Sequence, residues 1–137
     1  MNKLIYTLIA FCSFLYASAQ NGDEWKQRVA PSLLNISSET SVPFLVLLSQ
    51  QANISSARHL HSKNEKGEYV FNSLREISAQ TQTGIINEIR KTNASYESMF
   101  IINAVKVEGN YELIRSLASR PDVAKIVSDP LMRYEDP

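Results

Sequence analysis

The sequence contains very little cysteine, histidine and glycine. Cys12 is the only cysteine, so the chain has no internal disulfide and no cluster of thiolate ligands. The four glycines are not clustered, which excludes a glycine-rich phosphate-binding loop. Both histidines, His59 and His61, lie in one polar connection without an evident third ligand, and we interpret them as solvated side chains. The sequence therefore predicts no metal site and no cofactor.

The sequence also lacks an excess of either charge and lacks the usual catalytic patterns. It has 14 basic and 14 acidic residues, with no basic stripe, so we do not expect a nucleic acid partner. Its acidic residues are scattered rather than paired, and no serine stands in a G-x-S-x-G turn. We therefore expect a protein that is not an enzyme. The length of 137 residues and the apolar fraction of 44% predict one globular domain.

The N-terminus has the pattern of a secretory signal peptide. Lys3 precedes an apolar run over residues 4–16, and small residues follow at Ala17 and Ala19. A membrane anchor is the weaker interpretation, because a transmembrane helix needs about 20 apolar residues. We expect removal of residues 1–19 near Ala19, a secreted or periplasmic protein, and no stable membrane anchor.

The remaining chain predicts alternating strands and helices. Residues 20–41 form an N-terminal arm or short helix, since Trp25, Val29 and Leu33 share a helical spacing that Pro31 interrupts. The continuous apolar run "VPFLVLLSQ" predicts a central strand at 42–50. A long helix is expected over about 67–92. Its expected buried side chains are Val70, Phe71, Leu74, Ile77, Thr81, Ile85 and Ile89, and its expected polar face includes Arg75, Gln80 and Gln82.

The C-terminal half predicts two strands, a short helix and a last strand. The strands are "SMFIIN" (98–103) and "AVKVEG" (104–109), with a tight turn or bulge at Asn103 and Ala104. Asn110 is a good N-cap for the helix "YELIRSLASR", and "VAKIV" (123–127) alternates as a strand. We expect the core to contain Phe71, Phe100, Ile102, Leu113, Leu117 and Val123.

This order of elements, βαββαβ, predicts an α+β ferredoxin-like fold. Such a fold has one antiparallel four-stranded sheet with two helices on one face, so the other face of the sheet is expected to be free. The fold alone does not define a function.

The ordered segments "VPFLVLLSQQANIS", "KGEYVFNSLREISAQTQTGIINEIR", "MFIINAVKVEGN" and "LIRSLASRPDVAKIV" resemble a known family. They are similar to the N-terminal propeptide of subtilisin-like serine proteases, the inhibitor I9 domain, of the bacillopeptidase F type. The resemblance makes residues 42–129 the propeptide domain and 130–137 an extended C-terminal tail. The catalytic Asp, His and Ser motifs of those proteases are absent from this chain.

The resemblance implies an intramolecular chaperone and inhibitor of a subtilisin-like protease catalytic domain, acting in cis or in trans. The open sheet face would pack on the protease, and the tail would lie in its active-site cleft. Expected tail contacts are Leu131, Met132, Arg133 and Tyr134, and expected sheet-face contacts are Asn103, Lys106, Glu108 and Lys125. The family often has an acidic residue where Asn103 stands here.

Two alternatives remain open from the sequence. The chain is either the N-terminal part of a protease precursor or a free-standing inhibitor, and its end just after the last strand favours the precursor. Alternatively, it is a secreted ferredoxin-like binding module whose open face meets an unrelated ligand or a second copy.

Overall fold

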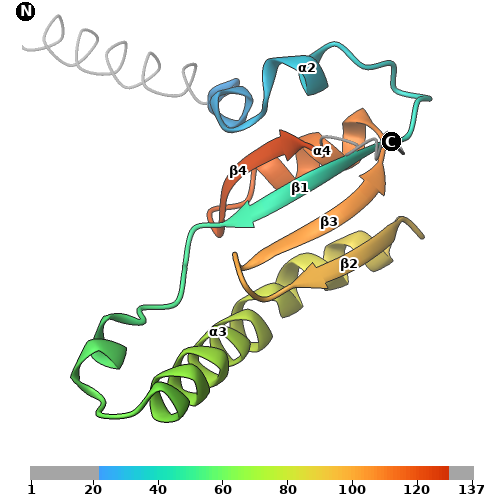
Figure 1. The fold of residues 1–137 in the computed structure, drawn as a ribbon. Coiled ribbons are helices and arrows are strands. Elements are labelled where there is room, and N and C mark those ends of the chain that lie inside the picture. The colour runs from blue at the N-terminus through green and yellow to red at the C-terminus, as the bar shows by residue number, and fades with distance from the viewer. Residues whose placement is uncertain (1–21, 130–137) are drawn as a thin grey trace, which may run out of the picture.

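A four-stranded antiparallel sheet organises the fold (Figure 1). The computed structural model describes residues 22–129. The strands are β1 (Val42–Leu48), β2 (Ser95–Met99), β3 (Ala104–Gly109) and β4 (Val123–Ser128), in the spatial order β2-β3-β1-β4. This order and the all-antiparallel pairing confirm the predicted α+β arrangement and are compatible with a ferredoxin-like fold.

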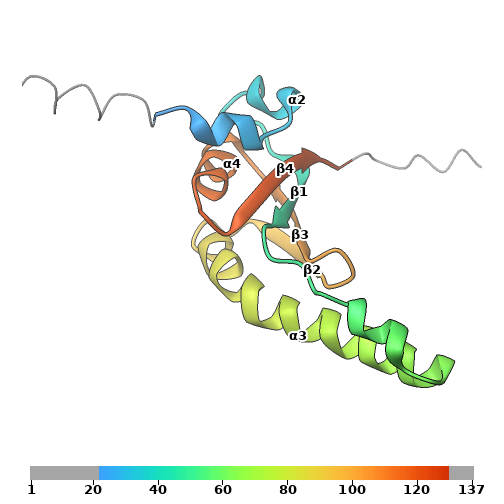
Figure 2. The same cartoon turned by 90° about the vertical axis from the view of Figure 1, so that its left-hand side faces the viewer.

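Two helices, α3 (Lys63–Arg90) and α4 (Tyr111–Ala118), lie on one face of the sheet (Figure 2). The core lies between the sheet and these helices. It contains Phe44, Val46 and Leu48 of β1, Val105 and Val107 of β3, Ile85 and Ile89 of α3, and four residues of α4. Leu113, Ile114, Leu117 and Ala118 of α4 are all buried, as their spacing predicts, and the Asn110 side chain caps this helix by accepting from the Leu113 N–H at 3.1 Å.

The N-terminal arm packs on the core. It contains the 3₁₀ helix η2 (Glu24–Arg28) and the short helix α2 (Pro31–Leu34), and it buries Trp25, Val29 and Leu33. The Ala30 N–H donates to the Ile126 carbonyl at 2.9 Å, beside a parallel bridge between Val29 and Ile126. The arm therefore covers the free edge of β4.

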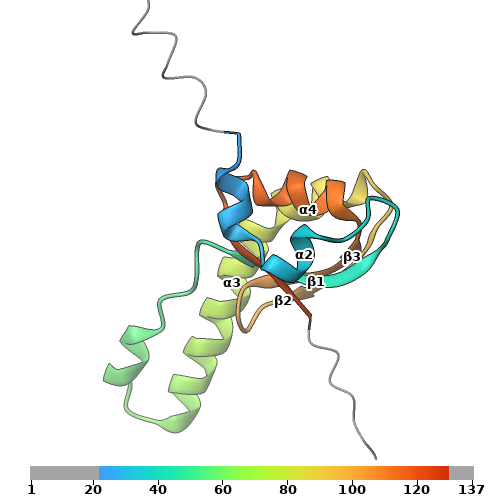
Figure 3. The same ribbon diagram turned by 90° about the horizontal axis from the view of Figure 1, so that it is seen from above.

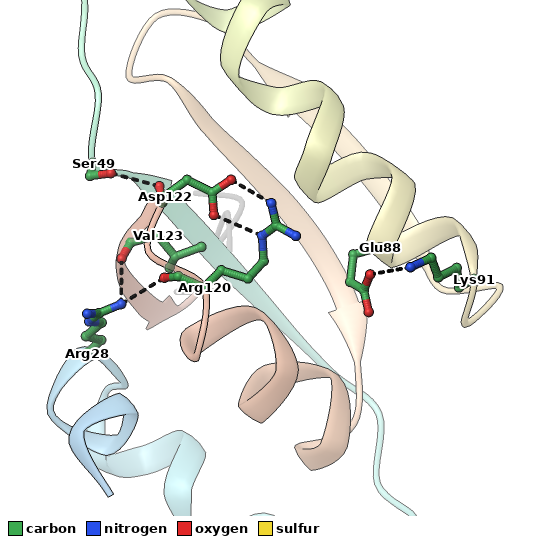
Figure 4. A network of polar contacts seen from close by, with 7 residues as sticks. All are labelled: Arg28, Ser49, Glu88, Lys91, Arg120, Asp122 and Val123. Atoms are coloured by element: carbon green, nitrogen blue, oxygen red, sulfur yellow. Dashed lines mark hydrogen bonds and ion pairs between the residues drawn. The ribbon is translucent and has the colours of Figure 1, made fainter. Parts of the chain in front are cut away.

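Arg28 fixes this arm to the end of α4 (Figure 4). Its guanidinium donates to the Arg120 carbonyl at 2.8 Å and to the Ala118 and Val123 carbonyls at longer range. Arg120 in turn forms a bidentate pair with Asp122, at 2.9 and 2.7 Å. The hydrogen bond with Asp122 raises the pKa of Arg120. A Cβ at Gly84 would lie 2.9 Å from the Arg120 guanidinium, so a larger residue there requires a shift of the Arg120 side chain.

Four expectations about the core are wrong. Phe71 and Ile102 are not buried, since they are 47% and 43% exposed, and Phe100 is half-buried. Gln82 was expected on the polar face of α3 but is 2% exposed. Phe71 is exposed because α3 extends well beyond the sheet, so only its C-terminal half has a core to cover (Figure 1). Phe100 and Ile102 lie in the β2–β3 turn, and the Gln82 amide is buried because it donates to carbonyls of that turn.

The bounds of β2 and the burial pattern of β4 also differ from the prediction. β2 begins at Ser95 and ends at Met99, and residues 100–103 form the turn to β3. The strict alternation expected in β4 fails, because Val123 and Ile126 are both buried. Leu47 pairs with Lys125 and Leu48 with Val123, so a bulge leaves Ala124 unpaired and resets the alternation.

Candidate interaction face of the sheet

The face of the sheet opposite the helices is not covered by any described element (Figure 2). The strand registers place Leu45 and Leu47 of β1 on it, with Val127 of β4 beside Leu45 and Ala104 of β3 beside Leu47. Met99 of β2 pairs with Ala104 and lies on the same face. Leu45, Leu47, Met99 and Val127 are all partly exposed. The open face therefore has an apolar centre.

This apolar centre explains why the β1 sequence is apolar at every position from 42 to 48. An antiparallel strand with one solvated face normally alternates apolar and polar residues. In β1, the alternate residues Phe44, Val46 and Leu48 fill the core, and Leu45 and Leu47 face outward. The neighbouring β3 does alternate, with Val105 and Val107 inward and Lys106 outward, as the sequence predicts.

Charged side chains surround the apolar centre. Lys106 lies opposite Glu97 on β2 and pairs with Asp129 at 2.7 Å. The hydrogen bond and the charge of Asp129 raise the pKa of Lys106, and Glu97 adds to the effect. Asp129 is the last described residue, and its N–H donates to the Pro43 carbonyl at 3.4 Å. The side chain of the last described residue therefore lies on the open face.

The predicted sheet-face residues fall into two groups. Lys106, Glu108 and Lys125 lie on the open face, as expected, with Glu108 and Lys125 exposed. Asn103 does not, and its placement is corrected: its side chain is 1% exposed. The tail residues Leu131, Met132, Arg133 and Tyr134 lie outside the described residues. The apolar members of the face, Leu45 and Leu47 above all, were not predicted, although the unbroken apolar run of β1 was the signal for them.

Asn103 instead forms the centre of a buried polar network. It has a positive φ of 38° at the end of the β2–β3 turn. Its Nδ2 donates to the Gln50 carbonyl at 2.6 Å and to the Thr81 hydroxyl at 2.9 Å, and its Oδ1 accepts from Gln82 at 2.9 Å. Gln82 also donates to the Met99 and Ala104 carbonyls. Asn103 thus joins the end of β1, the middle of α3 and the turn.

The described residues offer little for a small ligand on the open face. A hollow there, between Pro43 and the β2–β3 pair, has a volume of about 200 Å³. Pockets for small molecules are usually about 300–1,000 Å³. Within residues 22–129, no group of three or more metal-ligating side chains gathers, and no helix has the length and apolarity to cross a bilayer. A broad face with an apolar centre and charged edges instead suits a protein partner.

Comparisons with known proteins give no match. No family model matches the chain, and neither the curated proteins nor the solved structures contain a significant match.

Proposed function

We propose that this protein is a secreted propeptide-type inhibitor and intramolecular chaperone of a subtilisin-like serine protease. The observation that carries the proposal is the open sheet face, whose apolar centre contains Leu45, Leu47 and Val127. Exposing large apolar side chains in the middle of a sheet is unfavourable in water, and such patches mark interaction sites. The proposal includes export, with the signal peptide removed near Ala19.

The position of Asp129 supports the second part of the proposal, an inhibitory tail. Asp129, the residue that precedes the tail by one position, is held at the open face by Lys106 and Pro43, beside the proposed docking surface. In the proposed complex, the tail adds backbone hydrogen bonds to strands that line the protease cleft, as in β-augmentation. Leu131, Met132, Arg133 and Tyr134 occupy successive subsites there.

A preformed face also accounts for a chaperone activity. The core holds the sheet rigidly from behind through α3 and α4, so the face exists before the partner folds. Docking helices of an unfolded protease onto this face lowers the entropy cost of bringing them together. A stable complex of this kind buries about 800 Å² on each partner, so the proposal requires contacts from both the sheet face and the tail.

The test is inhibition of subtilisin by purified residues 20–137. We expect an inhibition constant in the micromolar range or tighter. Deletion of residues 131–137 should raise that constant at least about tenfold, because the tail contacts are removed while the described domain is unchanged. If the chain leaves subtilisin and several related proteases fully active, the proposed function is wrong, and a homodimer or an unrelated ligand becomes the better explanation of the open face.

A further inference from the structure

A second apolar surface lies away from the centre of the open face. It consists of Phe71 on α3 and Phe100, Ile101 and Ile102 in the β2–β3 turn, which we name the corner cluster. Ile101 is 70% exposed, and Phe71 and Ile102 are 47% and 43% exposed. The Phe71 and Phe100 rings meet edge-to-face with 5.7 Å between their centroids. The cluster is thus one surface built from two elements distant in sequence.

The cluster is exposed because the sheet ends before α3 does. Ile89, Ile85, Gln82 and Ser78 form the stripe of α3 that is buried against the sheet and the turn. The same stripe continues toward the N-terminus of α3 through Arg75 to Phe71. No side chain between residues 63 and 77 is buried, so this part of α3 projects from the domain, and we name it the α3 arm. The α3 arm therefore carries the continuation of the stripe that faces the core, and no described element covers it there.

The turn that carries Ile101 and Ile102 is held in place. Asn103 ties the turn to β1 and α3, and the Leu48 N–H donates to the Asn103 carbonyl at 3.2 Å. The Phe100 ring packs against the Phe71 ring. The Arg75 guanidinium also packs over Phe71, 5.6 Å from the centre of the Phe71 ring. A surface that is already ordered loses little conformational entropy when it binds.

The α3 arm projects on the same side as the open sheet face. Figure 2 shows α4 on one side of the sheet, with the β2–β3 turn and the N-terminal half of α3 reaching toward the other side. Figure 3, seen from above, agrees: α4 lies on one side of the sheet and the α3 arm extends away from the opposite side. A globular partner seated on the open face therefore meets the corner cluster as well.

The size of the cluster indicates that it is one part of a larger interface. Its three exposed side chains present on the order of 300 Å², if a whole large apolar side chain counts as about 200 Å². A stable pair of proteins needs about 800 Å² on each side, so the cluster alone is too small to hold a second copy of the chain. As an extension of the open face, it supplies an apolar anchor at one end of a larger interface.

We propose that the corner cluster is a second contact for the same subtilisin-like catalytic domain, which packs an apolar part of its surface against the cluster. This inference rests on the proposed function. It adds that the long α3 has a binding role and that Phe71 and Ile101 contribute to affinity independently of the tail.

The experiment measures the dissociation constant of residues 20–137 for subtilisin whose active-site serine is replaced by alanine. Ile101→Ser and Phe71→Ser are each expected to weaken binding about tenfold, because each removes an apolar side chain that is buried in the complex. The matched control is Ile54→Ser. Ile54 is 42% exposed, so it matches the cluster residues in exposure. It lies away from the cluster, because the two residues before it, Ala52 and Asn53, line a hollow on the other side of α3. Its substitution should leave the constant unchanged.

The outcomes separate the two proposals. If the wild-type chain binds and both cluster variants bind equally well, the corner cluster has no such role, and the proposed function stands. If the wild-type chain does not bind, both proposals fail. Urea unfolding and the mass in solution are measured for each variant. A wild-type dimer that Ile101→Ser converts to a monomer would show that a second copy covers the cluster, which also overturns the inference.

Discussion

Replacement of Asn103 tests whether the buried network holds the β2–β3 turn. In Asn103→Ala, three hydrogen bonds are lost, to Gln50, Thr81 and Gln82. Gln82 keeps its bonds to the Met99 and Ala104 carbonyls, but the Gln50 carbonyl loses its 2.6 Å donor. At about 1 kcal/mol for each hydrogen bond, the side chain contributes about 3 kcal/mol.

The backbone of Asn103 adds a separate contribution. Its φ of 38° lies in the left-handed region, which costs alanine about 1 kcal/mol more than asparagine or glycine. Asn103→Ala should therefore lower the free energy of unfolding by about 4 kcal/mol. Asn103→Gly loses the same hydrogen bonds without this strain, so it should be about 1 kcal/mol more stable than the alanine variant.

Urea unfolding followed by the fluorescence of Trp25 measures both effects. Trp25 is the only tryptophan and is 8% exposed, so its emission reports the loss of the core. The dependence of the unfolding free energy on urea concentration should be the same in all variants. The reasoning is refuted if Asn103→Ala costs less than about 1 kcal/mol, or if the glycine variant is less stable than the alanine variant.

Two further predictions concern a helix cap and the N-terminal arm. The Ser62 N–H donates to the Glu65 carboxylate at the start of α3, and this hydrogen bond lowers the pKa of Glu65. The hydrogen bond therefore contributes fully to stability above pH 4.5, and its contribution is lost as the pH falls through the pKa that Glu65 has in the folded chain. Glu65→Ala should accelerate amide exchange in the first turn of α3 at pH 7, but not at a pH below the pKa of Glu65 in the folded chain. Equal acceleration at the two pH values would contradict the role of Glu65 in the helix cap. Arg28→Ala should cost about 1–3 kcal/mol in urea unfolding, because the Arg120 carbonyl loses a charged donor. The control Lys26→Ala should cost less than about 0.5 kcal/mol, and an equal loss in both variants would refute the role of Arg28.

The sequence predicted the order of elements because local periodicity determines it. α4 shows this best: Asn110 caps it, and four apolar residues share the face that becomes buried. β3 likewise alternates because Lys106 and Glu108 are outward in the sheet. In both elements each residue has the burial that its polarity favours.

The errors occur where tertiary contacts override polarity. Gln82 is buried because its amide satisfies carbonyls of the turn, and no periodic pattern identifies a polar residue that has such partners. Phe71 is exposed because α3 extends beyond the end of the sheet. The periodicity of a helix does not show how far the helix extends beyond the elements it packs on. Asn103 was assigned to the sheet face through the family resemblance, but its left-handed backbone and its hydrogen bonds place it in the interior.

The candidate site was predicted only in part for the same reason. Lys106, Glu108 and Lys125 were recognised as outward residues, but the apolar centre requires the strand registers. Only the pairing of Leu45 with Lys106 and Val127 shows that a leucine of an apparently buried strand lies on the uncovered face.

The most direct test of the central claim is the binding of residues 20–137 to the serine-to-alanine variant of subtilisin, with and without Leu45→Glu. Leu45 lies in the middle of the open face, so a carboxylate there loses its water in the complex, and the neighbouring Lys106 is already paired with Asp129. We expect the wild-type chain to bind in the micromolar range or tighter, and Leu45→Glu to weaken binding at least about thirtyfold, from a cost of about 2 kcal/mol. Asn87→Glu, which adds the same charge on the exposed side of α3, should bind as the wild type does. Equal binding of the Leu45→Glu and wild-type chains would contradict docking through the open face.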